Sequence, residues 1–304
     1  MLKYVTKSLP SCGKKERIFT MIDLHTHSTA SDGSLSPSQL VALAAEQGLS
    51  AIALTDHDTA DGISEALSAA AKCRIELIPG IEMSCVWRGT EIHLLGYFLD
   101  ADHSAMRRDL SWFRKKREER NDTILDNLAE DGIVLSREEL CFERPDTAVT
   151  RAHFARLLAE KGYVKTPKEA FSNYLVYGGR YVPTKDEITP ELVMRFFQAH
   201  GIWPSLAHPV QYQLSEEALG ALLSELCPLG LRGLEVWHSS QDSYQSARLL
   251  GIARLLKLLP TGGSDFHGDS KPDIMLGRGF GSLRIQEHVL ENMKTDLAAM
   301  RQGM

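Results

Sequence analysis

Several features that would place a protein in a membrane or outside the cell are lacking from this chain of 304 residues. No uninterrupted apolar run approaches the roughly 18 residues that a membrane-spanning helix needs. Residues 1–20 lack the apolar stretch of a secretion signal, and we expect them to form an extension outside the fold. The five cysteines are scattered and include no Cys-x-x-Cys pair, so a disulfide framework is not expected. These absences predict a cytoplasmic protein that does not associate with a membrane.

An excess of positive charge is lacking as well. The net charge is −6 and the pI is about 6.0, which argues against a basic surface that coats long duplex nucleic acid but is compatible with a local basic pocket. The hydrophobic content of 43% and the charged content of 24% are ordinary for a soluble globular protein. The length suits one large α/β domain or two smaller ones, and nothing in the sequence requires an oligomer.

Short apolar runs alternate with helical patterns along most of the chain. Each apolar run reads as a strand that ends in polar residues, at 50–58, 74–84, 90–98, 201–209, 233–240 and 260–268. Ser36-Pro37 and Thr189-Pro190 are typical helix starts, with a capping residue before a proline at the first helical position. Strand–helix alternation at this spacing predicts parallel βαβ units.

One region interrupts the alternation. Residues 101–190 are rich in helical patterns, with one long candidate helix at 107–132 and another at 150–163. We interpret 101–190 as a helical insertion that forms a substrate lid, and residues 21–100 and 191–304 as the barrel domain around it.

Histidines and carboxylates gather where the predicted strands end. Alternate residues of a strand face the same side, so His25 and His27 point together. In a parallel barrel the carboxyl ends of the strands meet at one mouth, where imidazoles and carboxylates could hold metal ions. A single histidine of this kind is usually a hydrogen-bonded structural residue, so the metal interpretation depends on the coincidence of many strand ends. The residues concerned are His25, His27, Asp56, His57, Asp58, Glu82, His93, His208, Asp265 and His267.

These motifs carry a family resemblance. In order, "DLHTHSTASDG", "LTDHD", "GIEMS", "EIHLLGY", "LAHP" and "GSDFH" resemble the polymerase-and-histidinol-phosphatase (PHP) domain family, over about residues 21–284. The resemblance implies an α/β fold, a distorted (β/α)7 barrel with a site for three metals. It implies nine ligands: His25, His27, Asp32, His57, Glu82, His93, His208, Asp265 and His267.

The resemblance also divides these ligands among the metals. His25, His27, Glu82 and Asp265 would hold one ion. Glu82 would bridge to a second ion, held also by His93 and His208, and Asp32, His57 and His267 would hold a third. For the remaining carboxylates, Asp23, Asp56 and Asp58, we expect a role in orienting the ligating imidazoles. The alternative for all three, and above all for Asp58, is strand-end capping.

Clustered divalent ions suit the hydrolysis of phosphate esters. They lower the pKa of a bridging water, so that hydroxide forms near neutral pH, and they neutralise charge on the phosphoryl oxygens. We expect two to three bound ions. Mn is the preferred metal, and Fe or Zn is also compatible with these ligands. As catalytic residues we name Asp265, His267 and Glu82.

Selection of the substrate is expected to depend on the insertion. Arginine binds phosphate through two parallel hydrogen bonds. Arg151 begins an insertion helix and Arg180 lies on a glycine-rich loop, and with His238 they are our candidate substrate-binding residues. Arg117 and Arg120 are weaker candidates, because a solvated charged helix face is the favoured interpretation of 107–120.

The insertion with "NYLVYGGRYVP", then "AHP" and "LEVWHSS", resembles one PHP subgroup. That subgroup contains 3′,5′-nucleotide bisphosphate phosphatases and 5′–3′ exoribonucleases acting on short RNA. The resemblance therefore implies a phosphorylated nucleotide, or a short 5′-phosphorylated RNA, as substrate. Alternatives are a histidinol-phosphate phosphatase, a polymerase-type proofreading module, a carbon–nitrogen amidohydrolase and a metal-binding regulatory protein without turnover.

Overall fold

The strands of the protein form one mixed sheet that curls into a barrel. The computed structural model describes residues 21–141, 146–184 and 188–302, so the predicted extension at 1–20 lies outside the described residues. The strand order is β7-β6-β5-β4-β3-β2-β1-β8. The strands are β1 (Met21–Asp23), β2 (Leu49–Leu54), β3 (Glu76–Trp87), β4 (Thr90–Tyr97), β5 (Trp203–Leu206), β6 (Gly233–His238), β7 (Leu259–Gly263) and β8 (Ile285–Gln286).

The barrel closes where β7 returns to the chain that follows β1. The backbone N–H of Leu24 donates to the carbonyl of Gly262 at 3.3 Å, and that of Asp265 donates to the carbonyl of His25 at 2.9 Å. A side chain at Gly263 would place its Cβ 2.4 Å from the backbone nitrogen of His25, so this close approach requires glycine. Strand β8 adds to β1 in antiparallel fashion. The prediction of a distorted barrel is confirmed.

The expectation of parallel βαβ units is wrong between β3 and β5. Strands β3 and β4 form an antiparallel hairpin, and β4 pairs antiparallel with β5. The turn between β3 and β4 consists of Arg88 and Gly89, both with positive φ (47° and 79°), the geometry that tight hairpins favour. Two residues leave no room for the helix that a parallel crossover needs. Glu82 therefore lies within a long strand rather than at its end, and His93 lies within β4 as expected.

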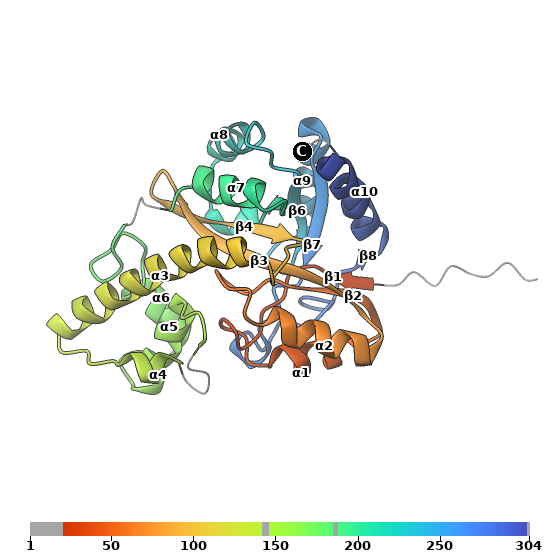
Figure 1. The fold of residues 1–304 in the computed structure, drawn as a ribbon. Coiled ribbons are helices and arrows are strands. Elements are labelled where there is room, and N and C mark those ends of the chain that lie inside the picture. Colours follow the sequence, from red (N-terminus) through yellow and green to blue (C-terminus); the bar gives the residue numbers. More distant parts are fainter. Residues whose placement is uncertain (1–20, 142–145, 185–187, 303–304) are drawn as a thin grey trace, which may run out of the picture.

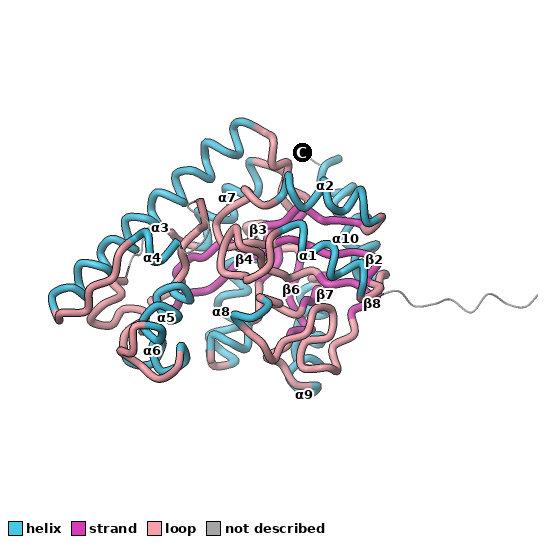
Figure 2. The backbone as a smooth tube through the Cα atoms, turned by 90° about the horizontal axis from the view of Figure 1, so that it is seen from below, coloured by secondary structure: helices cyan, strands magenta, loops and turns pink. Residues whose placement is uncertain are grey.

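The helices cover the barrel and build the insertion (Figures 1 and 2). They are α1 (Pro37–Glu46), α2 (Ile63–Cys73), α3 (Ser104–Glu130), α4 (Arg137–Cys141), α5 (Arg151–Glu160), α6 (Pro167–Asn173), α7 (Pro190–Ala199), α8 (Glu216–Leu226), α9 (Ser243–Leu256) and α10 (His288–Gln302), with short 3-10 turns at Pro209–Tyr212 and Gly268–Ser270. The predicted starts at Ser36 and Thr189 are confirmed, since each side chain accepts a hydrogen bond from the first turn of its helix. In the described part of the chain, no helix is both long and apolar enough to cross a membrane.

Helix α3 joins the two parts of the molecule. Near its start, Met106 and Phe113 pack into the core around the barrel. Further along, Ile124 and Leu128 belong to a separate apolar cluster that α5 and α6 complete. In both views α4, α5 and α6 lie to one side of the barrel, along the far half of α3 (Figures 1 and 2). The middle turns of α3 lie between these two cores and face the barrel mouth.

Candidate active site

The predicted ligands meet in one buried cluster. They fall into four overlapping groups, and within each group the candidate ligand atoms lie within 4.8 Å of one another. The groups are His27, Asp32, His57 and His267; His25, Glu82 and His208; His25, His238 and Asp265; and His57, Glu82 and His93. All nine predicted ligands are included, and His238 joins them. We call these residues the ligand cluster.

Glu82 occupies the centre of the ligand cluster. Its Oε1 lies 2.8 Å from Nδ1 of His93 and 2.7 Å from Nε2 of His208. Its Oε2 lies 3.2 Å from the nearest ring nitrogen of His25, of His27 and of His57. The two oxygens of one carboxylate thus face different sets of imidazoles.

Two members of the ligand cluster have an unusual backbone. His208 and Asp265 adopt positive φ angles of 22° and 58°, which cost a side-chain-bearing residue about 1–3 kcal/mol. The backbone N–H of His208 donates to Oε2 of Glu235 at 2.7 Å, and that of Asp265 donates to His25. These bonds hold both residues so that their side chains turn inward.

The donor set fits divalent cations. Several buried atoms of the ligand cluster have no hydrogen-bond partner in the part of the chain that the structure describes: Nε2 of His25, both ring nitrogens of His27, Nδ1 of His57, Oε2 of Glu82 and Nδ1 of His208. A buried polar atom without a partner costs about 1–3 kcal/mol, and such a concentration of them calls for an ion. Neutral imidazoles and carboxylates are the ligands that Mn, Fe and Zn accept.

The pKa values in the ligand cluster are shifted by burial and by the neighbouring charges. Burial alone would raise the pKa of Glu82, but His57, His25 and His93 hold that pKa well below its usual range. Burial lowers the pKa of His27, yet Asp265 and Glu82 outweigh this effect and raise it to about 9. For His208 burial prevails and lowers the pKa to about 4. The carboxylates are therefore ionised, and bound cations would take the place of protons on part of the imidazoles.

Glu235 supports the cluster from β6, and the sequence analysis missed it. Its Oε1 lies 3.0 Å from Nδ1 of His25. That contact fixes a proton on Nδ1 and leaves Nε2 of His25 as the ligating nitrogen. The signal was present in the sequence, since Glu235 is a carboxylate between the apolar residues Leu234 and Val236 of a buried strand.

The two oxygens of Asp265 have different neighbours. Its Oδ1 faces the ring nitrogens of His27 and His25, at 3.3 and 3.6 Å. Its Oδ2 accepts a hydrogen bond from Nζ of Lys271 at 2.7 Å and lies 3.5 Å from Nε2 of His238. Because the backbone N–H of Ser240 donates to Nδ1 of His238 at 3.0 Å, a neutral His238 carries its proton on Nε2. Nε2 of His238 faces Asp265 but has no hydrogen-bond partner among the described residues.

The expectation that Asp23, Asp56 and Asp58 orient imidazoles is wrong. Asp23 accepts hydrogen bonds from the backbone of Ser264 and of Gly277, at 2.8 and 2.7 Å. Asp56 and Asp58 likewise accept bonds from backbone N–H groups, those of Ser28 and Ser84, at 2.7 and 2.9 Å. Asp23 and Asp56 thus fix the loops that follow β7 and β1, whereas Asp58 binds the backbone of β3 two residues beyond Glu82.

Arginines of the insertion approach the ligand cluster through Glu91. This residue lies two positions before His93 on β4, and its Oε1 is 3.4 Å from Nε2 of His93. Arg151 donates to Glu91 at 2.8 Å, and Arg120 lies 3.6 Å from it. Arg120 is 9% exposed, and its Nε has no hydrogen-bond partner among the described residues. We call Glu91, Arg120 and Arg151 the arginine pocket.

The favoured interpretation of 107–120 as a wholly solvated face is wrong for two residues. Arg117 is buried and pairs with Asp58 and Ser84, and Arg120 lines the same small cavity. Burial and the nearby Arg117 lower the pKa of Arg120 to about 10. Arg180, in contrast, is not brought to the cluster: its guanidinium is exposed and pairs with Asp131 just beyond α3.

Comparison with known proteins decides the family. The model of the PHP domain matches residues 23–174. The chain belongs to the PHP family. A 5′-3′ exoribonuclease from Haemophilus influenzae is 38% identical over 246 residues, which are 81% of this chain and 89% of the relative. A 3′,5′-nucleoside bisphosphate phosphatase from Chromobacterium violaceum is 30% identical over 81% of this chain and 87% of its own length.

A solved structure agrees with this PHP assignment. A metal-dependent phosphoesterase from Bifidobacterium adolescentis superposes with a TM-score of 0.78 at 28% identity, over 91% of this chain and 96% of that protein. The prediction of a metal-dependent phosphoric ester hydrolase is thereby confirmed. The histidinol-phosphate alternative receives no support from these relatives.

Proposed function

We propose that this PHP phosphoesterase hydrolyses phosphate esters of 5′-phosphorylated nucleotides. Its action would be that of a 3′-phosphatase on 3′,5′-bisphosphonucleotides, of a 5′–3′ exonuclease on short RNA, or of both. The observation that carries the proposal is the arginine pocket beside the ligand cluster. One enzyme then has two anion sites: one for the phosphate that reacts, and one for a phosphate that is only held. The names of the two curated relatives agree with such substrates.

The ligand cluster would hold two to three divalent ions, with Mn preferred. We assign His25, His27, Glu82 and Asp265 to one site, Glu82, His93 and His208 to the next, and Asp32, His57 and His267 to the third. When bound, the ions would lower the pKa of the attacking water and neutralise charge on the phosphoryl oxygens. The opposed oxygens of Glu82 suit a bridge between two of these sites.

The chain's own residues position the substrate. Arg151 and Arg120 would hold the 5′-phosphate by charge-assisted hydrogen bonds, and Glu91 occupies their guanidinium groups until substrate arrives. On the other side, Lys271 donates to Oδ2 of Asp265 and would so keep Oδ1 directed into the cluster, with Nε2 of His238 lying 3.5 Å from the same Oδ2. Glu235 keeps His25 in the tautomer that a ligand requires.

The test is a comparison of substrates on the Mn-loaded protein. We expect hydrolysis of a 3′,5′-bisphosphonucleotide and of short 5′-phosphorylated RNA, and much weaker hydrolysis of the same RNA with a 5′-hydroxyl. Histidinol phosphate serves as the competing substrate. A preference for histidinol phosphate, or equal rates on 5′-phosphorylated and 5′-hydroxyl RNA, would contradict the proposal.

A further inference from the structure

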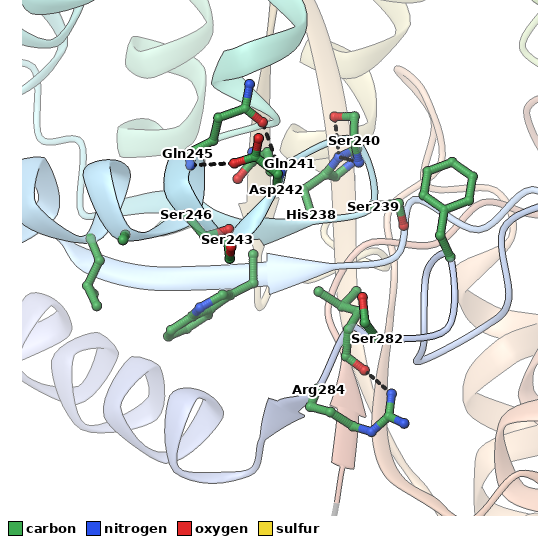
Figure 3. A pocket seen from close by; sticks show the side chains of 15 residues that line it. His238, Ser239, Ser240, Gln241, Asp242, Ser243, Gln245, Ser246, Ser282 and Arg284 are labelled. Carbon is green, nitrogen blue, oxygen red and sulfur yellow. Dashed lines mark hydrogen bonds between the residues drawn. The ribbon is translucent and has the colours of Figure 1, made fainter.

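A large groove adjoins the ligand cluster on the side away from the arginine pocket. It has a volume of about 880 Å³, within the range of roughly 300–1,000 Å³ that small-molecule sites occupy. One side comes from the end of β6 and the start of α9, with His238, Ser240 and Ser243 (Figure 3). The other side comes from the loop before β8, with Phe280 and Arg284. The proposed reaction uses none of these residues except His238.

The groove continues from the place where the reacting phosphate would lie. His238 lines it, and Nε2 of His238 is 3.5 Å from Asp265. In the sheet, β5 separates β4, which carries Glu91, from β6, which carries His238. His208 follows β5, and its ring centroid lies 5.1 Å from that of His93 and 5.4 Å from that of His238. A substrate with its 5′-phosphate near Glu91 and its scissile phosphate over the cluster would continue toward this groove.

The lining has the chemistry of a site for a single-stranded nucleotide. Phe280 lines the groove and is 63% exposed, so an aromatic face is present for a base to stack on. Trp237 is half-buried in the opposite wall and packs against the apolar cores of the barrel. Serine hydroxyls supply polar partners in the wall. Arg284 contacts only the carbonyls of Gly281 and Leu283 among its partners in the described part, with no carboxylate paired to it. Its charge is free for a backbone phosphate.

The one acidic residue of the groove lining, Asp242, is compatible with the binding of a negatively charged nucleotide. Asp242 accepts a hydrogen bond from the backbone N–H of Gln245 at 2.7 Å and caps α9. Its charge is therefore placed at the positive end of the helix dipole, which offsets part of its repulsion of a phosphate.

Resting on the proposed function, we propose that this groove binds the nucleotide that follows the scissile phosphodiester in a single-stranded RNA. The base stacks on Phe280, and Arg284 contacts the next phosphate. A 3′,5′-bisphosphonucleotide ends at the reacting phosphate and leaves the groove empty. The groove thus distinguishes the oligonucleotide from the mononucleotide among substrates that share the same reacting centre.

The experiment compares Phe280→Ala with the wild type on two substrates, 3′,5′-bisphosphoadenosine and a 5′-phosphorylated RNA of five nucleotides. Loss of one stacking contact should lower kcat/KM on the RNA roughly five-fold or more, with no change on the bisphosphonucleotide. Tyr244→Ala is the matched control, because Tyr244 is 76% exposed on α9 but does not line the groove; it should change neither rate. Arg284→Ala should make cleavage of the RNA less sensitive to salt.

Two results would overturn the groove proposal: equal losses by Phe280→Ala on both substrates, or no loss on the RNA together with an unchanged salt dependence in Arg284→Ala. Failure of the proposed function would look different, because the wild type itself would then not prefer 5′-phosphorylated nucleotides.

Discussion

The ligand cluster and the arginine pocket differ in how their residues are brought together. Most members of the cluster lie within a few residues of a strand of one sheet, and the barrel alone places them. The arginine pocket joins β4, the middle of α3 and the start of α5, which the chain separates by up to 60 residues. Changes in the ligand cluster should therefore affect hydrolysis of every phosphate ester, whereas changes in the arginine pocket should affect which substrate is preferred.

The largest effect is expected for the centre of the cluster. Glu82→Gln removes the charge that two sets of imidazoles share, so activity should fall by roughly 100-fold or more, given that even groups behind the ligands contribute about 10–100-fold. Metal analysis should find two to three Mn ions per wild-type chain and fewer in the variant. Glu76→Gln is the control, since Glu76 begins the same strand but pairs with Lys294 on the surface. Near-normal turnover and metal content in Glu82→Gln would rule out the bridge.

The arginine pocket should show a smaller but selective effect. Arg151→Ala is expected to lower kcat/KM on a 3′,5′-bisphosphonucleotide roughly 30-fold, because a charge-assisted pair is lost. On p-nitrophenyl phosphate, which has no second phosphate, the rate should hardly change. Arg195→Ala provides the matched control, as Arg195 lies on α7 and pairs only with Glu191 among the described residues. Equal losses on both substrates would assign Arg151 to the reacting phosphate or to folding.

The smallest effect is expected when the hydrogen bond from Lys271 to Asp265 is removed. Lys271→Met frees Oδ2 of Asp265, and we expect the affinity for Mn to fall about 10-fold, the lower end for groups that orient ligands. Lys271→Arg should restore most of it, since a guanidinium can donate to the same oxygen. Titration of the metal-free protein with Mn measures both. An unchanged affinity in Lys271→Met would show that Asp265 needs no such restraint.

The contrast between the two regions also explains what could be predicted from the sequence. Short motifs place His25 beside His27 and Asp265 beside His267, and these local patterns predicted a cluster of imidazoles and carboxylates at one mouth. The barrel type and the set of nine ligands, Asp32 among them, came from the family resemblance of the motifs. The Arg88-Gly89 turn between two alternating runs could have revealed the hairpin of β3 and β4. Glu235 was readable as a charge inside an apolar strand.

The arginine pocket could not be predicted in the same way. Whether Arg120 faces solvent or the barrel depends on how α3 docks between two apolar cores, and a helical charge pattern does not contain that information. The sequence favoured Arg151, at a helix start, over Arg180, on a loop, but it could not show that Arg151 pairs with Glu91 and Arg180 with Asp131.

An anion that binds in the arginine pocket must displace the carboxylate of Glu91. This carboxylate already neutralises part of the charge of Arg151 and Arg120, so an incoming anion gains only the difference between its own attraction and that of a monovalent group. A terminal phosphate carries about −1.5 to −2 charges at neutral pH and can win this competition. An internal phosphodiester carries a single charge and has little advantage over Glu91. The arginine pocket would thus bind a terminal phosphate in preference to an internal phosphodiester, so that cleavage is confined to the ends of nucleotide chains.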